Sequence, residues 1–496
     1  MKIKPGKRDT WRNEAKNQIS EPLRMYSPAS LKDVIKIVKE AERTGMSVRA
    51  VGSGHSWSDV AVGGDFLVLP DKLNESLPLE ESLLGDQVDT STLFRFESGM
   101  RIRELNELLD QRGLALPNMG GYDAQTYVGA MSTSTHGSGI QFGPLCDYVE
   151  TIEIVADEGI LYRVEPVGGI TDREKYEKVY LPGSSGRNLI QDDNWFNALK
   201  VSMGCMGVIY SITLRAVEKF WLKEVRILST WEEVKKQLKI GDVFKDNDHY
   251  EIIINPYQVK GQHRCLVTTR NKEKQAPDSL PADKTQRNFL SEFLASLPFI
   301  RKALKVIFDT LPRATPELIN ETMKGLVDDS YINKSYKVFN IGSANKITAY
   351  SAEIGFPLKD DKYIEAVDRF LEIARKLKEV GLFFLTSPVA LRFVKATNAF
   401  LSPQYGRDTC MVEIIVVKGT QGAFEMYEHF ENELLTFSGR PHWGQVNHLS
   451  GSHNLIETMY PRYNEWIEVY KQLNKRETFD NPFSRRVGFC RKKFVP

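Results

Sequence analysis

The sequence predicts an α+β protein with two domains and a C-terminal segment. In the first 150 residues, amphipathic helices alternate with short apolar strands, a pattern typical of layered helix-and-sheet domains. In the middle third, long strands of alternating polarity are separated by amphipathic helices, which is typical of an antiparallel sheet covered on one side. We expect domains over residues 1–218 and 219–437, and a loop-rich segment over 438–496 that returns to the first domain.

The elements of the first domain follow from caps and turns. Ser30–Asp33 has the form of a capping box, and the apolar residues after it have helical spacing, so a helix is expected over 31–43. A second helix should carry Ile102 and Leu105 on its apolar face, and a hairpin is expected over 149–164. The other elements expected here are strands at 47–51, 66–69, 92–97 and 208–217 and a helix at 194–203.

The second domain is expected to combine long strands with helices. The expected strands are 222–228, 250–255, 346–356 and 410–418, and the expected helices are 231–238, 361–379 and 421–436. Segment 271–287 is polar and rich in lysine, proline and aspartate, which predicts an exposed loop. Segment 288–326 is apolar with a helical pattern, which predicts an insertion or lid.

Composition and charge indicate an ordinary globular protein. The 496 residues are 41% hydrophobic and 26% charged, with a formal net charge of +1, so no nucleic-acid or acidic-membrane partner is expected. No apolar run approaches the roughly 20 residues that span a bilayer, and the basic N-terminus lacks the apolar stretch of a secretory signal. The five cysteines are widely spaced without a C-x-x-C pair, which favours reduced thiols in a cytoplasmic protein.

A glycine-containing turn is the most informative stretch of the chain. Residues 48–59 carry a short strand into Gly52-Ser53-Gly54 and then His55. Glycines allow backbone N–H groups to converge on an anion. A dinucleotide-binding loop remains an alternative, although it needs a small residue where Trp57 stands, and a plain surface turn is another. No G-x-x-x-x-G-K-[ST] motif occurs, so a nucleotide triphosphatase is not expected.

A second stretch of small residues follows within residues 116–139. Seven of the nine residues 129–137 are Gly, Ala, Ser or Thr. Such a run lets backbone pass close to a flat ligand and offers N–H and hydroxyl donors to it. A flexible linker is the alternative, but Val128 and Met131 argue against it because they can anchor the run in a core. The two stretches together indicate a flavin site.

These segments and several others resemble the flavin-linked oxidases of the vanillyl-alcohol oxidase fold, specifically the aldonolactone and alditol oxidase branch. The resemblance extends over nearly the whole chain, and the matching stretches are Arg49–Ser56, Leu116–Gly139, Val201–Leu214, Ser387–Phe393, Arg440–Gln445, Met459–Arg462 and Phe479–Pro482. It implies a PCMH-type FAD-binding domain and an antiparallel-sheet-plus-helices substrate domain that caps the flavin.

The resemblance also implies that the cofactor is FAD and that His55 is joined covalently to its 8α-methyl group. A covalent tether raises the flavin potential and prevents loss of the cofactor; a non-covalent contact by His55 is the alternative. The cofactor-binding residues expected from the resemblance are Val51, Gly52, Ser53, Gly54, His55, Ser56, Gly121, Thr126, Gly129, Ser132, Thr133, His136, Gly137, Gly207, Val208, Ile209 and His442.

The catalytic end departs from the pattern of the resembling oxidases. There, a Glu-x-Arg pair on a cap strand and a lysine in a His-Trp-x-Lys motif face the flavin. This chain has Ala390-Leu391-Arg392 and His442-Trp443-Gly444-Gln445. Arg392 can still stabilise an alkoxide or the anionic reduced flavin, with a structural salt bridge as the alternative. His442 is the best remaining general base by residue type, or else structural.

Two further residues complete the expected catalytic set. Gln445 can orient a substrate oxygen but cannot take a proton at neutral pH. Glu353 lies on an expected cap strand and is a candidate replacement for the missing carboxylate, with a plain surface glutamate as the alternative. The histidines at 442, 448 and 453 match no zinc spacing, so no metal is expected.

The expected reaction is oxidation of a CH–OH group, with hydride transfer to flavin N5 and reoxidation by O2 to H2O2. The expected partners are a small-molecule alcohol or lactone and O2. Loss of the charged pair predicts a less polar pocket and a bulkier substrate, such as a sterol-like or aryl alcohol. The alternatives are a dehydrogenase that uses a quinone or cytochrome and a catalytically silent flavin-binding protein. A doubly linked carbohydrate oxidase is disfavoured, because Cys146 lies outside the required pattern.

Overall fold

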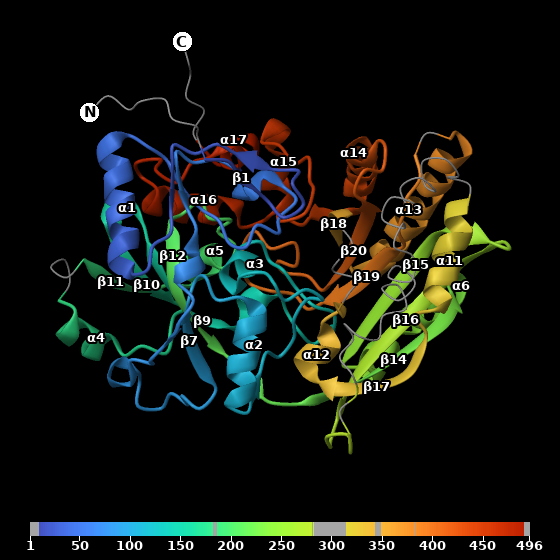
Figure 1. Cartoon of the computed structure of the whole chain (residues 1–496), viewed down its shortest axis with the longest axis horizontal. Coiled ribbons are helices and arrows are strands. Elements are labelled where there is room, and N and C mark those ends of the chain that lie inside the picture. Colours follow the sequence, from blue (N-terminus) through green and yellow to red (C-terminus); the bar gives the residue numbers. More distant parts are fainter. Residues whose placement is uncertain are drawn as a thin grey trace, which may run out of the picture.

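The computed structural model describes residues 9–181, 186–279, 281, 314–342, 349–381 and 383–490. Two bodies of sheet and helix lie side by side (Figure 1). The first half comprises the described residues up to 218 together with the C-terminal helices. The cap comprises the described residues of 221–437 and the strand Arg440–Pro441, which joins its sheet.

The first half contains a three-stranded parallel sheet and a six-stranded sheet. The strands are β3 (Arg24–Tyr26), β4 (Val48–Ala50), β5 (Phe66–Val68), β6 (Ser76–Leu77), β7 (Leu93–Glu97), β9 (Val149–Val155), β10 (Leu161–Glu165), β11 (Arg187–Gln191) and β12 (Val208–Arg215). The orders are β3–β5–β4 and β11–β10–β9–β12–β7–β6, and within the larger sheet β10 and β11 are parallel. The remaining elements are β1 (Trp11–Arg12), β2 (Ile19–Ser20), β8 (Leu114–Ala115), β13 (Val217–Glu218), α1 (Leu31–Thr44), α2 (Ile102–Gln111), α3 (Tyr127–Ser132), α4 (Arg173–Val179) and α5 (Asp193–Leu199).

Helix α1 confirms the predicted first helix and its cap. The Ser30 hydroxyl accepts a hydrogen bond from the backbone N–H of Asp33, which satisfies a donor at the helix start. Val34 and Val38 are buried on its apolar face, and Gly45 ends the helix at a φ of +69°. The predicted hairpin is also confirmed, as β9 pairs antiparallel with β10.

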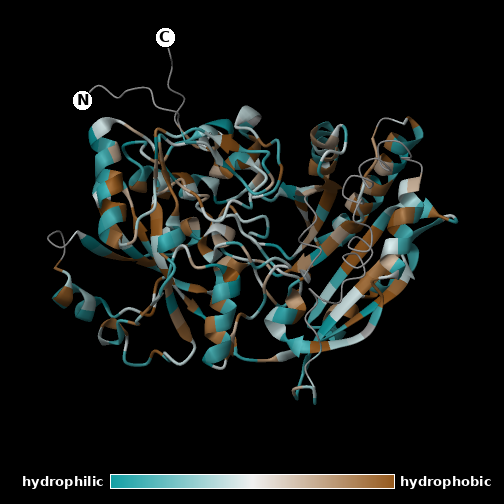
Figure 2. Cartoon of the chain, in the orientation of Figure 1, coloured by the Kyte–Doolittle hydropathy of each residue, from teal (hydrophilic) through white to brown (hydrophobic). Residues whose placement is uncertain are grey.

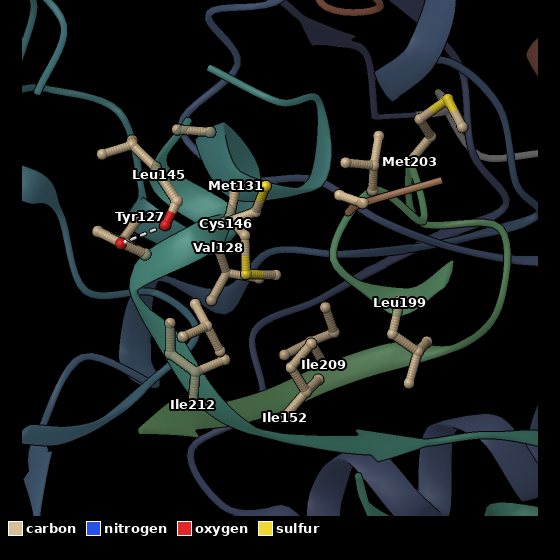
Figure 3. Close-up of a cluster of buried hydrophobic side chains, with 14 of the residues drawn as sticks. Tyr127, Val128, Met131, Leu145, Cys146, Ile152, Leu199, Met203, Ile209 and Ile212 are labelled. Atoms are coloured by element: carbon tan, nitrogen blue, oxygen red, sulfur yellow. Dashed lines mark hydrogen bonds between the residues drawn. The ribbon is translucent and has the colours of Figure 1, made fainter. Parts of the chain in front are cut away.

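Helix α3 anchors the small-residue stretch. Tyr127, Val128 and Met131 are buried against residues of β9 and β12, and the Tyr127 hydroxyl donates to the carbonyl of Leu145 at 2.8 Å (Figure 3). Gly129 and Ser132, three residues apart in the same helix, remain partly exposed. The helix therefore fixes its apolar side in the core and presents small side chains on another side.

The cap is an eight-stranded antiparallel sheet, and most of its helices cover one face, whereas the helix Ser335–Phe339 packs Val338 and Phe339 into the core of the first half. Its strands, in spatial order, are β17 (Asp328–Lys334), β14 (Trp221–Thr230), β16 (Gln262–Glu273), β15 (His249–Val259), β19 (Val389–Val394), β20 (Thr409–Val417), β18 (Ala349–Pro357) and β21 (Arg440–Pro441). Its helices are α6 (Trp231–Ile240), α7 (Val243–Asp246), α11 (Thr315–Lys324), α12 (Ser335–Phe339), α13 (Lys362–Glu379) and α14 (Ala423–Leu434). This arrangement confirms the predicted α+β class.

The two faces of the cap sheet differ in chemistry. Successive strand residues point to opposite faces, and Leu391, Val412 and Ile354 pack with the helices α13 and α14 in one core. Glu251 and Arg392 alternate with those apolar positions and lie on the other face. Apolar and polar residues accordingly alternate along these strands (Figure 2).

Several predicted boundaries differ from the structure. The helix expected at 194–203 ends at Leu199, and the strand expected over 208–217 is interrupted at Ala216 between β12 and β13. Strand β16 continues to Glu273, into the expected loop. Residues 282–313 and 346–348 lie outside the described residues, so of the expected helical insertion only α11 is described.

The C-terminal segment contains more helix than expected. Its helices are α15 (Leu455–Met459), α16 (Tyr463–Leu473) and α17 (Pro482–Arg486). Trp443, Tyr460 and Trp466 are fully buried in the same core as α3 and β12. The end of the chain is therefore built into the first half.

Candidate active site

The loop after β4 presents a run of unpaired backbone donors. The N–H groups of residues 52–56 donate to no acceptor in the described part of the chain, whereas Val51 and Trp57 on either side donate to the carbonyls of Val68 and Gly444. Gly54 has a φ of +75°, a conformation that favours glycine and turns neighbouring N–H groups toward one side. The loop can therefore hold an anionic or strongly polar ligand.

The two small-residue stretches lie against each other. A Cβ atom on Gly52 would collide with Thr126 Oγ1 and lie 3.7 Å from the Cα of Gly129, while one on Gly129 would lie 2.7 Å from the same Thr126 oxygen. The Thr126 N–H donates to Ser53 Oγ at 3.0 Å. Only residues without side chains allow the two backbones to approach in this way.

The C-terminal segment closes this cradle. The N–H of Trp57 donates to the carbonyl of Gly444 at 2.8 Å, and Ser58 Oγ donates to the carbonyl of Trp443 at 2.6 Å. Thr133 Oγ1 lies 3.2 Å from the position that a Cβ on Gly444 would take. The segments around Thr133 and Gly444, about 80 and 390 residues after the first loop in sequence, thus lie next to each other and to that loop.

His55 lies at the rim of the cradle. Its ring contacts Tyr122 edge-on, with 4.7 Å between the ring centroids. Burial lowers the pKa of His55 to about 4, so the imidazole is neutral at pH 7 and has a nitrogen lone pair. Unpaired N–H donors, close glycine contacts and a neutral imidazole together fit FAD, which carries a pyrophosphate and a flat ring.

The other hydroxyls and glycines of the expected cofactor set are held by local contacts. Ser56 accepts from Asn13 Nδ2 through its carbonyl at 2.9 Å, and Ser132 Oγ donates to the Val128 carbonyl at 2.8 Å. A Cβ on Gly121 would lie 2.8 Å from Ile341 Cγ2. A Cβ on Gly137 would collide with Asn118 Oδ1.

Gly207 directly precedes strand β12, which begins with Val208 and Ile209. A Cβ on Gly207 would lie 2.6 Å from the carbonyl oxygen of Val155, so the close packing of β12 on β9 accounts for the glycine. The side chains of Val208 and Ile209 are buried in the cores of the first half. These positions can meet a cofactor only through their backbone.

On the cap, a transverse row of residues brings two carboxylates together. Strand register places Ala390 opposite Glu413, and Glu413 opposite Glu353. Directly opposed residues of antiparallel strands point to the same face. Arg392 lies two residues from Ala390, so it shares that face. Ala390, where the resembling oxidases have a glutamate, therefore lies next to the carboxylate of Glu413 on the neighbouring strand.

Arg392 is held between carboxylates. Its Nε lies 3.3 Å from Glu251 Oε1 and its terminal nitrogen 3.6 Å from Glu413 Oε2. Arg270 lies on the far side of Glu251, at 2.9 Å. Burial alone would raise the pKa of Glu251, but the charges of Arg392 and Arg270 outweigh it and lower that pKa to about 2. The Arg392 side chain keeps 17% exposure, so its charge reaches the open side of the cap face.

Glu353 forms a buried pair with His136. The Nε2 atom of His136 lies 3.3 Å from Glu353 Oε1, and its Nδ1 lies 2.8 Å from the carbonyl of Gly137. Because a carbonyl only accepts, His136 Nδ1 carries a hydrogen and donates it to Gly137, and Nε2 faces the Glu353 carboxylate. The contact with His136 outweighs burial and lowers the pKa of Glu353 to about 2.

His442 is tied at both ring nitrogens. Its Nδ1 accepts from the N–H of Gly444 at 3.1 Å, and the carbonyl of Ser134 takes the other ring hydrogen. Burial lowers the pKa of His442 to about 4, so the ring is neutral at pH 7. Neither nitrogen has a lone pair free for a substrate proton, which speaks against His442 as the general base and for a role in positioning.

Gln445 is three residues after His442 and is partly exposed. Its Oε1 atom is buried and accepts no hydrogen bond within the described chain. An unpaired buried acceptor is costly unless a ligand group satisfies it. Gln445 can therefore accept a hydrogen bond from a substrate hydroxyl.

Two glutamates of the cap face, Glu413 and Glu251, are not among the residues predicted from the sequence. Each is a single glutamate in an apolar stretch of its strand: Met411-Val412-Glu413-Ile414 and Glu251-Ile252-Ile253-Ile254. A charged residue at an alternate position of a buried strand was the available signal. Glu413 lies opposite Ala390 and Glu251 lies opposite Arg392, so this face carries carboxylates although position 390 has none.

Other features of the chain bear on its chemistry. All five cysteines are free, and Cys490 alone is partly exposed. No group of three or more His, Cys, Asp or Glu side chains that could hold a metal occurs in the parts of the chain that the structure describes. Among the helices of the described residues, none is long and apolar enough to span a membrane.

Comparison with known proteins places this geometry in a family. An FAD-binding-domain profile matches residues 22–165, and a D-arabinono-1,4-lactone oxidase profile matches residues 212–487. The chain is 27% identical to L-gulono-1,4-lactone dehydrogenase of Mycobacterium tuberculosis, over 96% of this chain and 98% of that protein. It is 24% identical to L-gulonolactone oxidase of Mus musculus, over 97% and 98%. The cholesterol oxidase structure from B. sterolicum has the same fold, with a TM-score of 0.74 and 15% identity over 97% of this chain and 96% of that one.

The protein is thus an FAD-dependent oxidoreductase with a PCMH-type FAD-binding domain and a capping antiparallel sheet. The D-arabinono-1,4-lactone oxidase profile spans more than half of the chain. The chain belongs to the D-arabinono-1,4-lactone oxidase family.

Proposed function

We propose that this enzyme oxidises a CH–OH group of an aldonolactone or a related small polyhydroxylated compound. The observation that carries the proposal is the polar face of the cap sheet, where Arg392 is flanked by Glu251 and Glu413. Buried donors and acceptors are costly when unpaired, so this face rewards a ligand with several hydroxyls. A sterol-like substrate would place an apolar body over these charged groups, and covering charges with apolar surface is costly, so the polar face argues against the bulkier alcohol.

Each residue has a role that its contacts support. FAD, when bound, would supply the hydride acceptor for the substrate carbon. Arg392 stabilises negative charge that develops on the substrate oxygen. Gln445 orients a hydroxyl through its unpaired Oε1. Glu353 holds the His136 ring in place, and His442 positions the segment that closes the cradle.

The cofactor assignments remain part of the proposal. Loop 52–56 binds the polar part of FAD, and His55 forms the covalent link to the 8α-methyl group. We further propose that O2 reoxidises the flavin and yields H2O2, with a quinone- or cytochrome-dependent dehydrogenase as the alternative, since relatives carry both names. Free, mostly buried cysteines support a cytoplasmic location.

The test is anaerobic mixing of the holoenzyme with L-gulono-1,4-lactone, D-arabinono-1,4-lactone, xylitol or a sterol. We expect a lactone to bleach the flavin absorbance, and air to restore it with equimolar H2O2. Bleaching by the sterol alone would overturn the substrate class. Bleaching by a lactone that air does not reverse, but a soluble quinone does, would assign the dehydrogenase.

A further inference from the structure

We propose that Glu413 is the general base of this site, the group that accepts the substrate hydroxyl proton. This inference rests on the proposed function and assigns the step for which Ala390 and Gln445 leave no acceptor. It is carried by the position of Glu413 between Ala390, Glu353 and Arg392 on the face of the cap sheet.

Exposure distinguishes Glu413 from Glu353. The Glu413 side chain retains 12% exposure and the Glu353 side chain 4%. Glu353 is occupied by His136, whereas Glu413 has a single side-chain hydrogen bond, accepted by Oε1 from Ser351 Oγ at 3.1 Å. The small Ala390 opposite Glu413 leaves room for that carboxyl group beside Arg392. Glu413 is therefore the carboxyl group of the pair that a substrate can reach.

The surroundings of Glu413 suit a base. The groups that act on it are Arg392 from β19, Glu353 and Ser351 from β18, His136 from the first half and Tyr427 from α14. Burial and the negative charge of Glu353 raise the pKa of Glu413, although Arg392 opposes them. Two adjacent carboxylates do not ionise equally, so the one paired with His136 stays charged while the other takes up and releases a proton nearer to neutral pH.

The proposed step is the two-electron oxidation of an alcohol to a carbonyl. The O–H bond of the substrate breaks and its proton moves to a Glu413 carboxylate oxygen. The C–H bond on the same carbon breaks, and its hydrogen leaves with the electron pair to the flavin. The carbon–oxygen bond becomes a carbonyl, and Arg392 stabilises the oxygen while negative charge develops on it.

The first experiment transplants the carboxylate across the strands. E413Q and E413A should slow flavin reduction by a lactone by about 10²–10⁴-fold, as expected for loss of a general base, with nearly unchanged substrate affinity. The double variant A390E/E413A conserves volume and places a carboxyl group on the neighbouring strand, so it should recover most of the rate. The control E433Q removes a glutamate on α14 that pairs with Arg369 and should have no effect.

The second experiment follows protonation itself. E353Q removes the negative charge opposite Glu413, so the acid limb of the rate–pH profile should move to lower pH. Infrared difference spectra of the holoenzyme should show a carboxylic acid band that titrates, moves in E353Q and is absent in E413Q. If the flavin of E413Q is reduced as fast as that of the unmodified enzyme, Glu413 is not the base. The same conclusion follows if E413Q keeps both the titrating carboxylic acid band and the acid limb of the rate–pH profile. If the unmodified enzyme is not reduced by any lactone or polyol, the proposed function itself fails.

Discussion

The two sides of the candidate site are built by different means. The cradle of the first half uses backbone N–H groups, glycines and small hydroxyl side chains, and its key contacts are between Gly52, Thr126 and Gly129. The cap face uses long charged side chains, with one or two from each of several strands. The cofactor side therefore depends on small side chains that allow close backbone approach, and the substrate side depends on the positions of charged side chains.

The cradle should be the more sensitive of the two to a single methyl group. G52A adds a Cβ that collides with Thr126 Oγ1, so the purified variant should contain less than a tenth of the normal flavin, by absorbance, as its loop can no longer close on FAD. The second change T126A removes that oxygen and should restore flavin content. The control G85A meets nothing nearer than 3.5 Å and should stay yellow. Normal flavin in G52A would show that the loop is not the cofactor site.

The cap face should tolerate added volume but not lost charge. R392M removes the cation that stabilises the substrate oxygen, and we expect flavin reduction by a lactone to slow by about 10²–10³-fold with the flavin still bound. R392K keeps the charge but not the planar guanidinium group, so its rate of flavin reduction should lie between those of the unmodified enzyme and R392M. Stopped-flow reduction under nitrogen measures both. Loss of flavin from R392M would place Arg392 with the cradle instead.

This contrast also explains what the sequence could reveal. The cradle lies in two contiguous runs, 48–59 and 116–139, so its spacing and residue types can be recognised from the order of the residues alone. The α+β class and most elements followed from periodicity for the same reason. Local patterns were sufficient wherever the site is made of neighbours in sequence.

The cap face could not be predicted in the same way. Glu413 gains its meaning from opposing Ala390 and Glu353, and cross-strand register depends on how the whole sheet assembles. His442 has the residue type of a base, but its bonds to Gly444 and Ser134 occupy both nitrogens. Hydrogen-bond partners of this kind are tertiary information.

The proposed covalent link gives a smaller effect on the cradle. H55A should bind FAD without a bond, so acid precipitation should leave the colour in the supernatant instead of the pellet. The shape of the loop depends on Gly52 and Gly54, not on His55, so the variant should still be yellow before acid is added. Colour that stays in the H55A pellet would assign the link to another residue.

On the helix-covered face of the cap sheet, substitutions should affect stability but not chemistry. Leu391 is fully buried beside Arg392 in sequence but points to the opposite face. L391A should lower the free energy of unfolding by about 2–5 kcal/mol through lost burial and the cavity left behind. Urea unfolding measures this loss, and the rate of flavin reduction at about 25 °C should change less than twofold by the argument from strand alternation. A large loss of rate would mean that the two faces are coupled.

The last contrast separates buried histidines from buried carboxylates by pH. His249 and His442 have pKa values lowered to about 4 by burial, below the unfolded value of about 6.5. Their neutral forms favour folding above pH 6.5, and that contribution is lost as pH falls toward 4, because the unfolded chain binds protons first. Glu251 and Glu353 have pKa values of about 2 in the folded state, against about 4.3 in the unfolded state. Their contribution to stability is therefore lost only as the pH falls below about 4.3 toward 2. The free energy of unfolding of the holoenzyme, measured with urea from pH 8 to pH 2, should therefore fall in two stages. Each group should contribute a decrease of the order of 1–3 kcal/mol. Constant stability between pH 6.5 and 4 would show that these histidines are hydrated in the folded protein.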